Sequence, residues 1–305
     1  MQSVLNILNI ALTVMLPIFA VIGLAALFGR WSPLDARTLS RLIVYLFSPA
    51  LVFQNIVEAD FSTGELWSIF LMAILSSIIL LLISWGTASI LKFDRKLSSG
   101  FMMSILISNA GFLGFPVVEY SLGNKGLQYA VIFFAVANTI TNMIGIYVSS
   151  LGERSVRGAL KNVFLVPLIY TTALALWLNY QEVTLPLPVT RGVSILGQAA
   201  IPCAMVFLGL QLIETRVKSK PGPIVLASVL RLLVAPVIAF LLAGWLGISG
   251  LLADVMIIQL SMPTALFAAV FALEFGSDID FVTSTILVTT LASIFTLSIL
   301  LGVFL

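Results

Sequence analysis

The amino-acid sequence predicts an all-α polytopic membrane protein with ten transmembrane helices in two inverted five-helix repeats. Three observations predict this class: the composition, the length of the apolar runs, and a matched set of prolines in the two halves. The chain of 305 residues is 60% hydrophobic and 9% charged, whereas soluble domains carry about 25% charged residues. No soluble fold of this size needs so much apolar surface, so we expect the chain to lie in a membrane.

Ten apolar runs are long enough to cross a bilayer. A hydrocarbon core of about 30 Å requires about 20 apolar residues per helix, and no segment between the runs is long enough for a soluble domain. The net charge of +2 gives no indication of a nucleic-acid partner, so the bilayer is the expected surrounding. The predicted spans are residues 7–28, 37–57, 66–91, 98–122, 127–150, 160–180, 192–213, 222–246, 251–273 and 281–304.

Basic residues are concentrated at alternate loops between these spans. Twelve of the fifteen Lys and Arg residues lie in or beside the loops that follow spans one, three, five and seven, and the opposite loops are acidic. The positive-inside rule places basic loops in the cytoplasm, so we expect a multi-pass protein of the cell membrane with both termini on the outer face. The twelve are Arg30, Arg37, Arg41, Lys92, Arg95, Lys96, Arg154, Arg157, Lys161, Arg216, Lys218 and Lys220.

Prolines relate the two halves of the chain to each other. The first, second and fourth spans of each half carry a proline, at spacings of 32 and 67 residues in the first half and 35 and 61 in the second. Because each half has five spans, the second enters the membrane in the opposite direction, as in inverted-repeat transporters. We therefore predict one repeat over residues 1–150 and a second over 151–305. The prolines are Pro17, Pro49, Pro116, Pro167, Pro202 and Pro263.

Two of the predicted spans are interrupted at corresponding places. Span four contains the stretch from Ser108 to Pro116, with one asparagine, two glycines and a proline, and span nine contains the stretch from Gln259 to Thr264. Backbone that is left unpaired in hydrocarbon costs several kcal/mol per group, so such breaks survive only against protein or a water-filled cavity. Broken helices near the midplane are typical of a transporter's binding site.

The breaks offer binding groups for either sign of charge. Two converging helix N-termini would bind an anion without a buried formal charge, whereas free carbonyl ends could hold a cation. Gly111 and Gly114 allow positive φ and a close approach of a ligand to the backbone. The amide of Asn109 suits a carboxylate, although a hydrogen bond between helices would explain it as well.

Further polar candidates lie in spans five and eight. Asn138 and Asn142 are four residues apart and share a helix face, where they could complete a polar cavity or simply hold helices together. Arg231 lies about ten residues into span eight, where a charge is costly. It could face an anionic substrate or bind the freed carbonyls of a broken helix. Weaker candidates are Gln54, Gln198 and Gln259.

Acidic side chains are missing from the centres of the interrupted spans. Proton-coupled antiporters usually rely on such residues, so coupling to protons through a buried acid is disfavoured. Transport coupled to sodium, with the ion bound by carbonyls, hydroxyls and amides, is compatible with the sequence.

Four stretches of the sequence carry a family resemblance, and their combination is more specific for that family than any one stretch. They are Tyr45 to Leu51, Asn109 to Pro116, Ile201 to Gly209, and Ser261 to Gly276. They resemble the auxin efflux carrier family, which contains the plant PIN-FORMED carriers and many bacterial permeases, and the resemblance covers essentially the whole chain. The link from Leu151 to Leu160 replaces the long cytoplasmic loop of the plant hormone exporters, so the chain resembles a bacterial-type member of the inner membrane. Asn162-Val163 stands where the family commonly has an asparagine–proline pair.

This resemblance implies a fold like that of bile-acid symporters and related antiporters, in which spans four and nine cross at their breaks. Spans 3–5 and 8–10 would form a transport domain that moves against a scaffold of spans 1, 2, 6 and 7, as in an elevator. It implies a carrier of small organic anions, carboxylates, bound at the crossing, and it is consistent with a homodimer. The crossing maps onto Asn109, Gly111, Pro116, Pro263 and Thr264.

Other functions fit the sequence less well. The nearest alternative is a sodium-coupled symporter of the bile-acid type. An enzyme is not expected, because the chain has no histidine for a Ser–His dyad and no aspartate pair within the spans. A channel is disfavoured because repeated filter-like glycine motifs and charged rings are lacking. The sequence indicates no cofactor and no metal ion, and it does not name the substrate, the direction of transport or the coupling ion.

Overall fold

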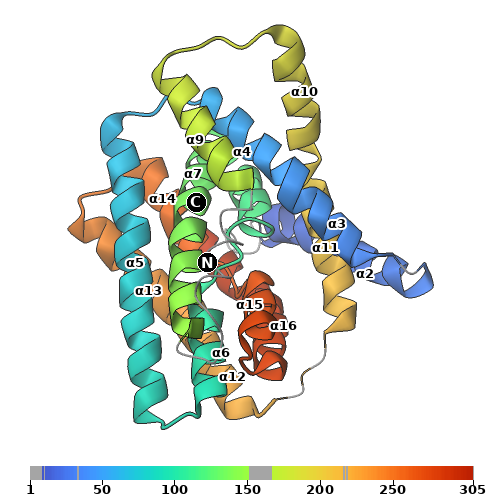
Figure 1. Cartoon of the computed structure of the whole chain (residues 1–305), viewed down its shortest axis with the longest axis vertical. Coiled ribbons are helices and arrows are strands. Elements are labelled where there is room, and N and C mark those ends of the chain that lie inside the picture. Colours follow the sequence, from blue (N-terminus) through green and yellow to red (C-terminus); the bar gives the residue numbers. More distant parts are fainter. Residues whose placement is uncertain are drawn as a thin grey trace.

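A computed structural model describes residues 9, 11–32, 34–150, 167–215, 217 and 219–304 of the chain, without the side chains of 11, 142–150, 214, 274, 275, 303 and 304. These described residues are helical apart from short links, and they form no strand beyond one isolated bridge. Figure 1 shows how these helices are arranged. The helices are α2 (Leu16–Trp31), α3 (Ala36–Leu42), α4 (Ser48–Val57), α5 (Thr63–Ile90), α6 (Arg95–Leu106), α7 (Gly114–Ser150), α9 (Pro167–Tyr180), α10 (Leu187–Gln198), α11 (Ala200–Glu214), α12 (Pro221–Val229), α13 (Ala235–Trp245), α14 (Gly250–Leu260), α15 (Phe267–Phe275) and α16 (Ile279–Phe304).

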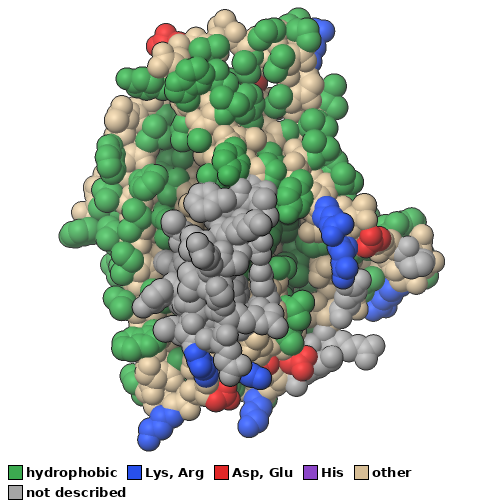
Figure 2. Space-filling model, in the orientation of Figure 1, with side chains coloured by type: hydrophobic (Ala, Val, Ile, Leu, Met, Phe, Trp, Pro, Cys, Tyr) green, Lys and Arg blue, Asp and Glu red, His purple; other side chains and the backbone are tan. Residues whose placement is uncertain are grey.

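Apolar helices of membrane-spanning length confirm a polytopic membrane protein. Figure 2 shows hydrophobic side chains over much of one face, with basic side chains mainly at its lower end and on its right side. The described helices also overlap all ten predicted spans, although ten crossings in two inverted repeats stay a prediction. Six stretches are long and apolar enough to cross alone: Leu12–Trp31, Ala36–Val57, Thr63–Ile90, Leu187–Ile213, Pro221–Trp245 and Ile279–Gly302.

Three prolines widen a helix instead of breaking it. Pro17, Pro49 and Pro236 each lie two residues after the end of a π-helical turn, at Ala11–Met15, Ile43–Phe47 and Leu230–Val234 respectively. A proline removes one N–H and its ring clashes with the carbonyl four residues earlier, and a wider turn relieves that clash while the helix continues. Pro236 therefore behaves like Pro17 and Pro49, although the proline pattern gave it no partner.

The helices pack in two groups. In the first, α2 packs along α11, and α4 packs on α9 and α10. In the second, α5, α6 and α7 pack on one another and on the C-terminal helices α12 to α16. Figure 1 shows α10 and α11 on the right of the molecule and α5, α13 and α14 on the left.

Gly209 explains how closely α2 and α11 approach each other. A Cβ atom built on Gly209 would lie 2.3 Å from the carbonyl oxygen of Ile22 and 2.9 Å from the backbone nitrogen of Ala26. Backbone atoms cannot move aside as a side chain can. Only glycine therefore fits at this contact, and van der Waals packing through small residues is the usual basis of helix association in membranes.

Candidate functional site

The two sequence-predicted breaks meet in space. Residues 107–113 separate α6 from α7, and residues 261–266 separate α14 from α15; we call these two segments the crossing. The N–H of Asn109 donates to the carbonyl oxygen of Pro263 at 2.8 Å, and the N–H of Ala265 donates to the carbonyl oxygen of Ile107 at 2.9 Å. Around the antiparallel bridge between Ser108 and Thr264, the segments thus satisfy part of each other's backbone.

Arg231 binds the carbonyl ends of the broken helices. Its side chain is fully buried, and Nη1 donates to the carbonyl oxygen of Ile105 in α6 at 2.8 Å. Nη2 and Nε donate to the carbonyl oxygens of Leu260 and Met262 at 2.8 and 2.7 Å. Of the two roles considered for this arginine, these contacts match the binding of freed carbonyls.

Thr264 binds a further carbonyl of α6. Its hydroxyl donates to the carbonyl oxygen of Ser104 at 2.7 Å, while its own N–H donates to Oγ1 of Thr289 at 3.2 Å. All three residues are fully buried. Carbonyls at the C-terminal ends of α6 and α14 are therefore already occupied by protein donors, which leaves few of them for a bound cation.

The backbone N–H groups at the N-terminal ends of α7 and α15 differ from these carbonyls, because they lack hydrogen-bond partners among the described residues. Within the described part of the chain, the N–H groups of Ala110, Gly111 and Phe112, before α7, have no acceptor, and the same holds for Leu266 and Phe267, where α15 begins. Unpaired N–H groups at a helix N-terminus carry partial positive charge and bind anions. The crossing therefore presents donors, with the acceptors largely taken.

Two buried amides accompany these donors. Asn109 is 3% exposed, and its side-chain amide can both donate and accept hydrogen bonds. Gln259 is fully buried, and neither its Oε1 nor its Nε2 has a partner among the described residues. Buried polar groups without partners are rare and call for an explanation, and a ligand that completes them is one.

The glycines of the first break allow positive φ but do not adopt it. Among the described glycines, positive φ occurs at Gly123, Gly247, Gly250 and Gly276. A Cβ atom on Gly111 would lie 3.0 Å from the ring of Phe134, and one on Gly114 would lie 2.6 Å from Oε1 of Gln259. Side chains of the protein therefore lie close to the backbone at these two positions.

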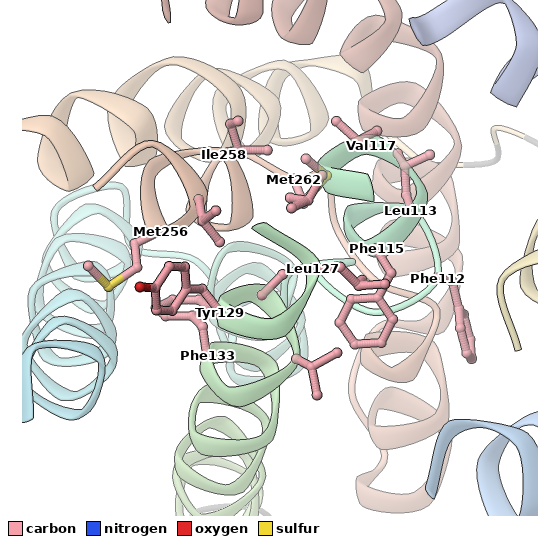
Figure 3. Close-up of a cluster of buried hydrophobic side chains, with 14 of the residues drawn as sticks. Phe112, Leu113, Phe115, Val117, Leu127, Tyr129, Phe133, Met256, Ile258 and Met262 are labelled. Atoms are coloured by element: carbon pink, nitrogen blue, oxygen red, sulfur yellow. The ribbon is translucent and has the colours of Figure 1, made fainter. Parts of the chain in front are cut away.

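A cavity of about 450 Å³ reaches the crossing from the side of α3. At its inner end, Phe112 contacts Phe207 of α11 with ring centroids 5.4 Å apart, and Phe267 of α15 at 6.0 Å. Figure 3 shows Phe112 at the edge of the buried cluster, pointing away from Tyr129 and Phe133. Asp35, Arg37, Ser40 and Gln211 are polar residues of the lining. The cavity therefore leads from a polar mouth to an aromatic end beside the free N–H groups.

The remaining predicted site residues lie on α7. Pro116 is buried in its first turn, where a missing N–H costs little. Asn138 is half-buried and lies one turn beyond Phe134, the residue that packs against Gly111. This places Asn138 one helical turn from the crossing. The side chain of Asn142 lies outside the described residues.

Some residues of the site were not found from the sequence. Ser104 and Thr289 bond to Thr264 from α6 and α16, and both look like ordinary helix hydroxyls in the sequence. Phe112 and Phe207 are two among 21 phenylalanines, so composition alone could not single them out. The available signal was the position of Phe112 within the first break.

Comparison with known proteins agrees with this architecture. A family model described as "Membrane transport protein" matches residues 10–156 and again residues 153–301. The chain is 28% identical to an uncharacterized transporter of Methanothermobacter thermautotrophicus, over 86% of this chain and 87% of that protein. It is 26% identical to an uncharacterized transporter of Methanocaldococcus jannaschii, over 88% of this chain and 89% of that protein. It is also 26% identical to a Rhizobium meliloti protein named "Putative malonate transporter", over 93% of this chain and 92% of that protein. The chain therefore belongs to the membrane transport protein family, the auxin efflux carrier family of transporters.

Proposed function

We propose that the protein carries a small organic anion across the cell membrane and binds its carboxylate at the crossing. The observation that carries this proposal is the asymmetry of the two breaks. Arg231 and Thr264 donate to the carbonyls of α6 and α14, whereas the N–H groups before α7 and at the start of α15 have no acceptor in the described chain. A site with free donors and occupied acceptors selects an anion. The name of the Rhizobium relative points to the same substrate class.

The proposed mechanism is an elevator with alternating access. The group of α2, α4, α9, α10 and α11 would be the scaffold, and the group of α5 to α7 with α12 to α16 would move with the substrate. Support comes from the crossing, which is hydrogen-bonded within the second group. Phe112 meets the first group through a ring contact with Phe207, and such an apolar contact can slide without leaving a polar group unpaired.

The open cavity suggests which side the substrate enters in this state. It lies beside α3, next to Arg37 and close to the end of α2, whose last turn carries Arg30. On the positive-inside rule this is the cytoplasmic side, with both termini on the outer face and the second five-helix repeat inverted relative to the first. The structure would then represent an inward-open carrier of ten crossings.

Sodium-coupled symport is the alternative. It would need carbonyl or hydroxyl oxygens free to bind the ion, and those of Ser104, Ile105, Leu260 and Met262 already accept hydrogen bonds. Uptake of a labelled carboxylate into proteoliposomes, with and without a sodium gradient, separates the two. We expect uptake without sodium, and strict sodium dependence would replace our proposal by the symporter.

The binding site is tested by one buried amide and a matched control. A panel of mono- and dicarboxylates is screened by thermal shift, and hits are titrated against Asn109→Ala and Asn55→Ala. The Asn55 amide is also buried but donates to the carbonyl oxygen of Leu51 in its own helix. Because a hydrogen bond to a charged group contributes about 1.5–3 kcal/mol, Asn109→Ala should weaken binding at least about tenfold. Equal affinity in wild type and Asn109→Ala would remove the crossing as the site.

A further inference from the structure

The crossing has a charge balance that can be counted. Arg231 is the one charged side chain that is fully buried among the described residues. Its guanidinium lies on the C-terminal ends of α6 and α14, and each such end carries about half a negative charge. The single positive charge of Arg231 is therefore offset by two helix ends and is not available to a ligand.

The opposite helix ends are not offset. The N-terminal ends of α7 and α15 each carry about half a positive charge, and no described acidic side chain is buried beside them. Together they supply about one positive charge. A helix end alone would be weak evidence for a ligand, but the buried and unpartnered amide of Gln259 lies against Gly114, the first residue of α7.

The other polar groups near these ends are neutral. The amide of Gln259 has no partner in the described chain, that of Asn109 is also uncharged, and an amide can donate to a carboxylate or accept from a protonated carboxyl group. The charged residues in the cavity lining, Asp35 and Arg37, have opposite signs and are both exposed. Exposed charges in contact with water interact weakly, so the mouth adds little net charge.

From this balance we infer that the crossing accepts one net negative charge, so that it binds monocarboxylates as they are and dicarboxylates only in the singly protonated form. The inference rests on the proposed function and adds the ionic form of the substrate. A dicarboxylate dianion takes one proton from bulk water as it binds and returns it when it is released on the other face. The charge moved per substrate is then the same for both kinds of acid, and no acidic side chain of the protein is required.

The test compares two probes of nearly equal size, malonate and its monoamide malonamate, in titrations of the purified protein between about pH 6 and pH 8.5. Malonamate keeps one negative charge throughout. We expect its apparent affinity to be independent of pH, whereas that of malonate should fall about tenfold for each pH unit above the second pKa of malonic acid. In proteoliposomes, uptake of malonate should acidify the lumen and uptake of malonamate should not.

Other outcomes have distinct meanings. Malonate affinity that does not change with pH, or that exceeds malonamate affinity at the alkaline end, overturns the inference and leaves the carrier proposal intact. Asn109→Ala should weaken both probes by a similar factor and keep the pH slope of malonate, since it removes an amide and no charge. If neither probe binds at any pH and no acid of the carboxylate panel gives a thermal shift, the proposed function fails and the inference fails with it.

Discussion

The main-chain N–H of Asn109 donates to the carbonyl oxygen of Pro263 at 2.8 Å, which joins the break in one half of the chain to the break in the other. Neither segment could stay unwound at this depth alone, because unpaired backbone in hydrocarbon is too costly. The pairing satisfies the backbone between the helix ends and keeps those ends in a fixed relation. Site geometry therefore depends on the few side chains that hold the pair together.

Arg231→Gln should destabilise the protein strongly. The change removes three charge-assisted hydrogen bonds and leaves the carbonyls of Ile105, Leu260 and Met262 with weaker partners or none. Each buried acceptor that is left unpaired costs about 1–3 kcal/mol, so we expect a large drop in melting temperature in detergent. Arg231→Lys keeps the charge, so its melting temperature should lie between that of the wild type and that of Arg231→Gln.

Arg191→Gln is the matched control for that change. Arg191 is exposed on α10, and surface substitutions of this kind usually stay within about 0.5 kcal/mol. A drop for Arg231→Gln no larger than that for Arg191→Gln would contradict the role of Arg231 as the bond between the broken helices.

Thr264→Val tests the hydroxyl at the crossing. The Oγ1 of Thr264 donates to the carbonyl oxygen of Ser104, which belongs to another helix. A buried acceptor left unpaired costs about 1–3 kcal/mol, and valine has nearly the same volume. We expect a lower melting temperature for Thr264→Val and near wild-type behaviour for Thr264→Ser. Thr285→Val is the control, since that buried hydroxyl donates to Phe281 within its own helix, and it should have the smaller effect.

Sequence reasoning located the crossing because its cause is local. Proline weakens a helix locally, because it removes an N–H donor, so Pro116 and Pro263 marked the two stretches in which breaks could occur. The apolar runs gave the membrane class and the helices, since burial in lipid depends on composition. The role of Arg231 was only narrowed to two alternatives, because its position in span eight does not say which groups face it.

The remaining features depend on contacts between distant residues. The hydroxyl of Thr264 finds Ser104 only after the two breaks have paired. Pro17 and Pro49 were counted with Pro116, yet they widen a turn and leave the helix continuous. A single sequence does not distinguish these outcomes, because neighbouring helices decide whether the freed carbonyl is relieved by a wider turn or by a new partner.

Gly209→Ala should be destabilising although alanine favours helices. Its Cβ would lie 2.3 Å from the carbonyl oxygen of Ile22, so α2 and α11 would have to separate. Overpacking of this kind costs about 1–3 kcal/mol. Gly86→Ala is the control: Gly86 lies within α5 and a Cβ there meets nothing within 4 Å, so the substitution should stabilise by up to about 1 kcal/mol. Melting temperatures that move in the same direction for both variants would contradict the packing assigned to Gly209.

Gln259→Met should raise the stability of the ligand-free protein. Methionine has a similar shape, and it removes two buried polar atoms that have no partner among the described residues. An unsatisfied buried group costs about 1–3 kcal/mol, so the melting temperature without ligand should increase. Gln198→Met, at an exposed glutamine of α10 whose amide donates to Ser194, should not produce this gain.

The same variant separates binding from stability. If the substrate completes the Gln259 amide, Gln259→Met should bind carboxylates more weakly although it melts at a higher temperature. Functional sites commonly retain such a conflict between stability and activity. A lower melting temperature in Gln259→Met would mean that the amide has a bound water or another partner in the ligand-free protein, and it would remove Gln259 from the set of groups that await a ligand.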